Sequence, residues 1–439
     1  MKAGVRAFLF RGGTSKGLFF RAADLPPHLR AVVPAGGAKK SGSSDDTKPL
    51  DNFIATAMGS DRYGMQLDGV GGGISSTSKV AIVEKSSRPL HDVDYVFGQV
   101  DMKTGRVDWS GSCGNLASAV GLFALEEGLV DRRPAEEEGL VDINGKIPPG
   151  EGRPALVKIF QANLQYSIHV TVPHEKAAQD QTTTIPGVEA PGRPIAVNFL
   201  RPRVGNLPLL PTGNVRDVLQ LGPEVCRRAG VPSSAVEASL VCAANPTIFV
   251  RAADLALHNN PFPLHADAAH LQPVIDEIRR QGARQMGLPL TDAVRVSWLA
   301  PPQPYTTTAG VEVGPGEVDL TGCVTTPGRL YHHAFTGTGA TNLACLAAIP
   351  HSIAHSLAPP SSSCASIPLG MVPAQAGGTR KAQVRLGQPA GVMTVQALCR
   401  WAGGGGGGGE HKYAGGEWVA EQAGFVRTAR LLFSGHVHV

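Results

Sequence analysis

Short apolar runs separated by turn-forming residues dominate the chain and predict many strands and few helices. A half-buried strand is expected where apolar residues alternate with small or polar ones over about four to eight positions, and a fully buried strand where a short run is apolar throughout. The runs of these kinds are Val5–Phe10, Gly17–Phe20, Lys79–Val83, Val93–Val100, Leu156–Ile159, Tyr166–Val172, Ile195–Phe199, Ile248–Val250 and Arg295–Leu299.

Apolar residues recur at helical spacing in a few segments. Leu116–Leu129 follows the small-residue turn Trp109–Asn115, and Gly128 lies near its end, where a helix stop is expected. The turn Phe335–Gly339 opens a similar small-residue helix in the second half, so a duplicated fold with one equivalent turn per half is plausible. The other predicted helices are Asn52–Met58, Leu271–Met286 and Ala340–Ala348.

A chain of 439 residues is too long for one ordinary core, so two domains are expected. The predicted domains are residues 1–190, with 415–439 packing back on them, and residues 191–414. The polar stretch Ala177–Pro194 with its three prolines predicts a linker or a long exposed loop. Further loops are expected at Ala35–Lys48, Asp68–Gly73, Ser361–Ser366 and the low-complexity glycine run Gly403–Gly409, and Phe425–Val439 returns to strand or helix patterning.

Composition and charge exclude several classes of function. No window of about 18 apolar residues exists, and the net charge of +4 is spread over scattered basic residues, which argues against a membrane span and against nucleic-acid binding. The N-terminus enters apparently structured sequence at once, and the 7 cysteines are irregularly spaced, so a reducing, cytoplasmic location is expected. The segment Arg11–Lys16 lacks the GxxxxGK[ST] spacing and Gly71–Ser76 lacks GxGxxG, which argues against a phosphate or dinucleotide loop at either place.

No metal site is expected, because the 14 histidines include no HExxH and the cysteines no CxxC. His332 and His333 are adjacent, and on a strand their side chains would point to opposite faces.

Two residues stand out as candidates for proton transfer. Cys113, in SGSCGN, precedes a predicted helix, whose free N–H groups and dipole favour an anion, so its thiol could donate or accept a proton. Lys79 begins an apolar strand, where partial burial favours the neutral amine that can act as a base. The alternatives stay open: Cys113 as a small buried residue beside a helix cap, and Lys79 as a strand-end lysine that reaches solvent.

The segment Arg11–Lys16 offers a second kind of site. Turn amides around Gly13 and the hydroxyls of Thr14 and Ser15 could bind a carboxylate, although an ordinary hairpin loop explains the same residues. Ser76 and its neighbours in ISSTS add hydroxyls with the same two interpretations.

Six blocks together resemble the PrpF-like family, which includes aconitate isomerases, 4-oxalomesaconate tautomerases and methylitaconate isomerases. They occur in the family's order and cover nearly the whole chain, but they do not specify the substrate. The blocks are FRGGTSKGLFF, DGVGGGISSTSKVAIV, SGSCGNLASAVGLFA, AFTGTGAT, RLGQPAGVM and FVRTARLLFSGHVHV.

The resemblance implies an α+β fold of two diaminopimelate-epimerase-like domains. Each domain would wrap a mixed, mostly antiparallel sheet around a central helix, with the active site in the cleft between them. The family's proposed acid/base pair falls on Lys79 and Cys113. A homodimer is expected, with neither metal nor organic cofactor, and the substrate-binding positions are Gly13, Thr14, Ser15, Ser76, Gly114, Asn115, Thr336 and Gly337.

One cysteine and one lysine fit a shift of a proton and a double bond. The resemblance implies that the substrate is an aconitate-like acid, such as cis- or trans-aconitate or 2-methylaconitate. Epimerases of this fold use a cysteine from each domain, whereas the second-half turn has none and Cys345 should face the core. The alternatives are a 4-oxalomesaconate tautomerase and a non-catalytic accessory protein to an iron–sulfur aconitase-like dehydratase. Departures from the family pattern at Gln388 and Ala390, and at Leu330 in place of a histidine for which His332 or His333 could substitute, leave the acid open.

Overall fold

The chain forms two units in the computed structural model. One unit combines Met1–Phe199 with Val426–Val439, and the other is Leu200–Phe425. The expected loops at Ala35–Lys48 and Ser361–Ser366 and most of the glycine run fall largely outside the described residues. The structure describes residues 4–34, 46–130, 154–174, 182–257, 260, 262–263, 268–325, 330–359, 378–403 and 416–439.

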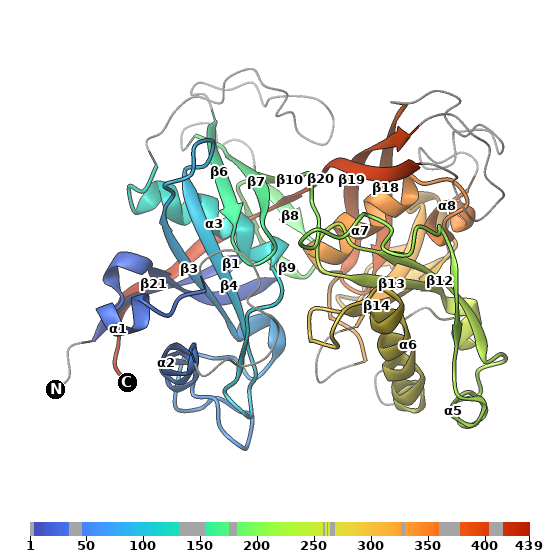
Figure 1. Cartoon of the computed structure of the whole chain (residues 1–439), viewed down its shortest axis with the longest axis horizontal. Helices are drawn as coiled ribbons and strands as arrows, with labels where there is room; N and C mark the ends of the chain where they lie inside the picture. The colour runs from blue at the N-terminus through green and yellow to red at the C-terminus, as the bar shows by residue number, and fades with distance from the viewer. Residues whose placement is uncertain are drawn as a thin grey trace. The chain divides into compact units, whose positions relative to one another are not determined.

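The first unit is built on a mixed sheet. Strands pair in the order β21, β1, β2, β3, β4, β6 and β7, with β5 on β4 and β10 on β7. The β2–β3 and β4–β6 pairs are parallel and the other pairs with a determined register are antiparallel. In Figure 1 the red strand β21 lies beside the blue strand β1. The strands are β1 Val5–Gly12, β2 Ser15–Arg21, β3 Lys79–Lys85, β4 Val93–Val100, β5 Val107–Asp108, β6 Ala155–Gln161, β7 Tyr166–Val172, β10 Ile195–Leu200 and β21 Ala429–Val437.

Helix α3 (Gly114–Glu126) packs against one face of this sheet (Figure 1). Phe123 of α3 meets Phe8, Phe10 and Phe19 with ring centroids 5.2, 5.7 and 5.5 Å away. Strand residues alternate between the two faces, so these three phenylalanines mark the face of β1 and β2 that α3 covers. The opposite face packs its apolar residues against α2 (Lys48–Met58), with α1 (Pro27–Arg30) beside it.

Gly12 explains how α3 approaches the sheet so closely. A Cβ on Gly12 would lie 2.6 Å from the Asn115 carbonyl oxygen and 3.0 Å from Leu116 Cα. Such separations are below van der Waals contact, so only glycine allows the first turn of α3 to cross β1 at this point. The N-terminus of α3 is therefore fixed against the end of β1.

The second unit repeats the pairing pattern of the first. The successive pairs β12–β13, β13–β14, β14–β17, β17–β18 and β18–β19 alternate between antiparallel and parallel, as β1–β2 to β6–β7 do. β11 and β20 extend this sheet by antiparallel pairing, and α7 packs against β18 and β19. Its elements are β11 Asp217–Gln220, α5 Pro223–Arg228, β12 Ala235–Val241, β13 Thr247–Arg251, α6 Gln272–Gln285, β14 Arg295–Ala300, β15 Tyr305–Thr306, β16 Glu312–Val313, β17 Leu320–Val324, α7 Gly337–Ala347, α8 Ile353–Leu357, β18 Thr379–Gln388, β19 Gly391–Gly403 and β20 Gly416–Arg427.

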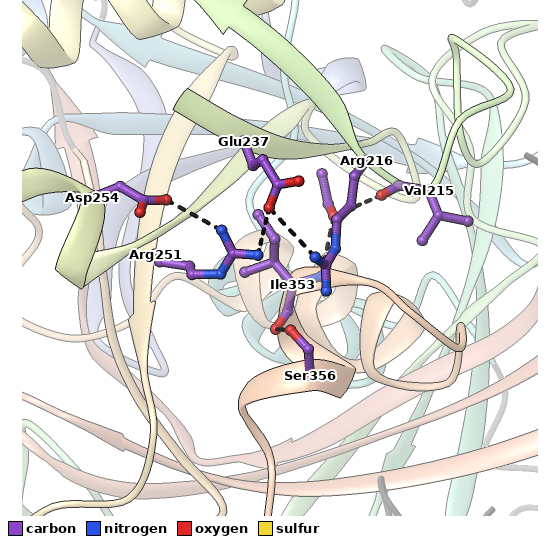
Figure 2. A network of polar contacts seen from close by, with 8 residues as sticks. Val215, Arg216, Glu237, Arg251, Asp254, Ile353 and Ser356 are labelled. Carbon is purple, nitrogen blue, oxygen red and sulfur yellow. Dashed lines mark hydrogen bonds and ion pairs between the residues drawn. The ribbon is translucent and has the colours of Figure 1, made fainter. Parts of the chain in front are cut away.

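Two arginines and two carboxylates fasten β11, β12 and β13 at one end of the second unit. Figure 2 shows Glu237 between Arg251, at 2.6 Å, and Arg216, at 3.4 Å. Arg251 also reaches Asp254 at 3.5 Å. All four side chains are partly screened from solvent, so the network joins neighbouring strands through charge as well as through backbone hydrogen bonds.

The α+β fold of two similar units expected from the sequence is confirmed, and the strands and helices predicted from periodicity all occur. Three expectations were wrong. From residue 182 on, the expected linker or long exposed loop is a hairpin of β8 (Thr183–Ile185) and β9 (Val188–Gly192), with Gly187 at a φ of 83° in its turn. The small-residue turns before α3 and α7 also end earlier than predicted, because both helices start within them. None of the helices in the described ranges has the length and apolar character needed to cross a bilayer.

Candidate active site

Cys113 caps the N-terminus of α3. Its backbone is extended, and its Sγ accepts a hydrogen bond from the Leu116 N–H at 3.5 Å. The sulfur also lies 3.7 Å from the hydroxyl oxygen of Ser15, and both side chains are buried. Helix geometry leaves the N–H groups of the first turn, including those of Gly114 and Asn115, without partners inside the helix. A negative charge on the sulfur is therefore favoured by the helix end.

The turn between β1 and β2 is attached to α3 through Asn115. The Asn115 side-chain amide donates to the Thr14 hydroxyl at 3.0 Å, and its oxygen accepts from Arg427 Nε at 2.8 Å. Gly13 has a φ of 52°, and a Cβ there would lie 2.6 Å from Asn115 Oδ1. Asn115 thus uses its side chain to hold the turn, which leaves its backbone N–H as the group for an anion.

The corner between β20 and β21 closes the same turn from the other side. Gly13 N donates to the Thr428 carbonyl at 2.8 Å, and Arg11 Nη1 donates to the same carbonyl at 2.9 Å and to the Gly13 carbonyl at 3.0 Å. Arg427 is almost completely buried, and burial lowers the pKa of its guanidinium to about 9, whereas a negative charge on Cys113 would raise it. Residues from both ends of the chain therefore build the surroundings of Cys113.

Lys79 lies at the start of β3 and is held by a network of its own. Its Nζ donates to Gln99 Oε1 and lies 5.5 Å from the centroid of the Phe97 ring. The Gln99 amide nitrogen donates to the carbonyls of Ser75 and Ser78, at 3.1 and 3.0 Å. These two bonds fix which way the amide points, so its oxygen faces the lysine.

Strand register places Lys79 and Ser15 on one face of the sheet. Lys79 is paired with Gly17 of β2 and with Gln99 of β4. Side chains at paired positions, and those two residues apart on a strand, share a face. Ser15 is two residues before Gly17, so Ser15 and Lys79 both lie on the face that α3 covers. The structure thus brings the candidate lysine to the same face as the Ser15–Cys113 contact.

The glycine-rich loop before Lys79 is organised by Gln66. Its Oε1 accepts from Gly73 N at 2.9 Å and from the Ser78 hydroxyl at 2.7 Å, and its amide donates to Ser60 at 3.1 Å. Ser76 is buried in a short 3-10 helix, Ser75–Thr77, three residues before the lysine. The hydrogen bonds of Gln66 therefore fix the conformation of the loop that leads to Lys79 at the start of β3.

Two buried tyrosines share the electrostatic surroundings of Cys113. Burial raises the pKa of Tyr95 and of Tyr166 well above the usual value, and a charge on Cys113 raises both further. Their hydroxyls consequently stay protonated, and they add no negative charge near the sulfur.

In the second unit, Thr336 caps α7 as Cys113 caps α3. The hydroxyl oxygen of Thr336, a predicted substrate-binding residue, accepts a hydrogen bond from Gly339 N at 3.2 Å. One of its lone pairs is therefore occupied by capping the helix. Gly337 begins the helix. Gln388 is buried and its Oε1 accepts from Phe335 N at 2.8 Å, which makes it a support for the helix end. Cys345 is buried within α7, as expected, so the second helix end carries no thiol.

The paired histidines before α7 differ from the prediction. His332 and His333 stack, with ring centroids 4.4 Å apart and an interplanar angle of 28°. Their side chains do not diverge, because the backbone is irregular here and His332 Nδ1 accepts from Ala334 N at 3.2 Å. Among the described residues, no group of three or more histidine, cysteine or acidic side chains is arranged to hold a metal.

Gln66, Gln99 and Arg427 were missed by the sequence analysis. Gln99 had a signal, because a glutamine on the same side of the predicted strand as Tyr95 and Phe97 is a polar residue on an apolar face. Gln66 had none, and Arg427 lies in the block FVRTARLLFSGHVHV but had no signal for its role, since the partners of both residues depend on tertiary contacts.

Comparisons with known proteins identify the family and the fold. The family model described as PrpF protein matches residues 2–439. A 2-methyl-aconitate isomerase of Shewanella oneidensis is 33% identical, over 99% of this chain and 96% of that protein. A 2-methyl-aconitate isomerase of Cupriavidus necator is 32% identical, over 99% and 97%. The crystal structure of a methylitaconate-delta-isomerase superimposes with a TM-score of 0.65 at 25% identity, covering 99% of this chain and 95% of that one.

Proposed function

Because the chain belongs to the PrpF protein family, we propose that it is an isomerase that shifts a proton and a double bond within a small unsaturated polycarboxylate of the aconitate type. The observation that carries the proposal is that Lys79 and Ser15 share one face of the sheet and that Ser15 contacts Cys113, the cap of α3. A proton donor, a proton acceptor and an anion-binding helix end are the parts that such a reaction needs.

In the proposed reaction, Lys79 and Cys113 are the acid/base pair. One of them removes the acidic proton on the carbon next to the double bond of the substrate. The electron pair of that C–H bond delocalises over the double bond and the carboxylate, and the other group returns a proton at the far carbon. The double bond moves by one position, and the atoms of the substrate are unchanged in number.

The carboxylates of the substrate are assigned to the helix ends and turns. Gly114 and Asn115 offer backbone N–H groups at α3, and Thr336 and Gly337 offer the equivalent positions at α7. The turn of Gly13, Thr14 and Ser15, together with Ser76, supplies further donors. Such donors stabilise the charge that develops on a carboxylate during proton removal. The proposed reaction uses no cofactor.

A screen by NMR in deuterated water tests the proposal. Incubation with cis-aconitate, trans-aconitate, 2-methylaconitate, methylitaconate and 4-oxalomesaconate reports both product formation and the carbon that exchanges its proton. We expect turnover of at least one acid in the presence of a metal chelator, and its loss in Lys79→Ala and in Cys113→Ala. Lys85→Ala, at the exposed end of the same strand, is the matched control and should retain activity. Full activity in both site variants would refute the assigned roles.

The screen also distinguishes the proposed isomerase from the two alternative functions. Preference for 4-oxalomesaconate would favour the tautomerase, and no turnover of any acid would favour the accessory role. The homodimer and the cytoplasmic location remain predictions, to be checked by light scattering and by fractionation of cells.

A further inference from the structure

We propose that Arg427 is a positioning residue that stabilises the thiolate form of Cys113, which rests on the proposed role of Cys113 in proton transfer. Arg427 lies where β20 ends, and its Nε donates to Asn115 Oδ1 at 2.8 Å, two residues after Cys113 in α3. It thereby brings a positive charge to the helix end that carries the thiol.

The location of the guanidinium is fixed from several sides. Its Nη1 donates to the Val426 carbonyl at 2.8 Å, and its Cδ would lie 2.9 Å from a Cβ placed on Gly13. Asn115 is itself tied to Thr14, so it has little freedom to turn away from Arg427. A long side chain held this tightly keeps its charge at one place relative to the cap of α3.

Burial strengthens the electrostatic interactions of this charge, because little water screens it. The side chain is 4% exposed, and desolvation acts against the charged form of Arg427, whereas a negative charge on Cys113 acts in its favour. Opposite charges attract, so a guanidinium held at the helix end favours a negative charge on the sulfur that caps this end. The helix end and the Leu116 N–H act in the same direction, and burial of the sulfur acts against it.

The role matters for the reaction because a thiol must lose its proton readily to serve as a proton donor or acceptor near neutral pH. Lys79 is positively charged when it carries a proton and contacts a neutral glutamine. Arg427, in contrast, is charged throughout the physiological range, so it biases Cys113 at every stage of the cycle.

The rate at which iodoacetamide alkylates Cys113 tests this role without any turnover. The reagent reacts with the thiolate, and mass spectrometry of the peptide that contains Cys113 separates it from the six other cysteines of the chain. Arg427→Met removes the charge, and Arg427→Gln removes it but keeps a donor for Asn115. Arg427→Lys keeps the charge, and Arg430→Met, on the exposed side of β21, is the matched loss of an arginine.

We expect both neutral variants to react about tenfold more slowly than the parent at pH 7.5, and all variants to converge at high pH, where the thiolate is complete. Arg427→Lys should stay within about threefold of the parent, and Arg430→Met should match it. Unchanged or faster alkylation in a folded neutral variant would overturn the inference. If Arg427→Met does not fold, Arg427→Gln decides the matter, and if neither folds, a tenfold slower reaction in Arg427→Lys would count against a role of charge.

The two proposals fail separately. Turnover in the parent with normal alkylation of the neutral variants leaves the isomerase standing and removes the role of Arg427. Slow alkylation of the neutral variants without turnover of any acid supports the role of Arg427 and removes the proposed isomerase.

Discussion

Replacing Gln99 with glutamate places a carboxylate against the amine of Lys79. The substitution is nearly isosteric, but it also replaces the amide nitrogen that donates to the Ser75 and Ser78 carbonyls with an oxygen, so the attraction to the Lys79 amine must orient the new carboxylate. Two unit charges about 3 Å apart attract by roughly 5 kcal/mol at an effective dielectric constant of about 20. Desolvation of the new carboxylate offsets part of this, and an opposite charge at such range commonly shifts an ionisation by about one to three pH units.

The assay is the pH dependence of kcat on the acid that the screen identifies. The limb of the profile that belongs to Lys79 should move to higher pH by about one to three units in Gln99→Glu. If the neutral amine is the base, the rising limb moves and activity at neutral pH falls roughly tenfold or more. If the ammonium is the acid, the falling limb moves and activity extends to higher pH. The direction of the change therefore also assigns the two roles.

Gln99→Met is the control, because it removes the acceptor without adding a charge. We expect it to lower kcat through loss of orientation and not to move the Lys79 limb upward. The reasoning is refuted if Gln99→Glu is folded and active and neither limb moves by more than about 0.3 units, because a new charge in contact with the proposed catalytic lysine must shift its ionisation.

Other predictions concern stability. Gly12→Ala forces a methyl against the Asn115 carbonyl and should lower the free energy of unfolding by about 1–3 kcal/mol, whereas Gly435→Ala, with open space around it, should cost far less; chemical denaturation measures both. Glu237→Gln breaks two ion pairs and should cost about 1 kcal/mol in the same assay, less in high salt. Burial lowers the pKa of His355, so below about pH 6.5 the unfolded chain takes up a proton that the folded state resists, and stability falls. His355→Gln should therefore lose less melting temperature between pH 8 and pH 5.5 than the parent, and an equal loss would contradict this.

Local pattern predicted those elements whose side-chain types match their surroundings. The run that starts at Lys79 was found because its next four residues are apolar and buried. Strand β18 was missed although Lys381–Leu386 alternates polar with apolar residues, and Arg380 is buried there with its guanidinium 6.0 Å from the Trp418 ring. A rule that places arginine at the surface misassigns such a strand.

In the candidate site, too, some residues could be predicted from the local sequence and others could not. Cys113 and Lys79 could be proposed from neighbouring residues and from the family resemblance. Their supports could not, since Gln99 lies 20 residues from Lys79, and Arg427 lies 312 residues from Asn115. Contacts over such separations are set by strand register and packing, which a single sequence does not encode in any local pattern.

Because β1 pairs with β21, the sheet of the first unit can be completed only after β21 has been synthesised. Arg11 and its acceptor Thr428 are 417 positions apart, so at ribosomal rates of about 5–20 residues per second, roughly 20–80 s separate their emergence. During that interval β1 pairs with β2 alone and presents an open strand edge, which is a template for wrong pairing. A nascent chain can therefore fold most of its first unit early, yet it cannot complete the surroundings of Cys113 before its last strand is released. Chaperones that shield strand edges should then affect the yield of active protein more than its rate of synthesis.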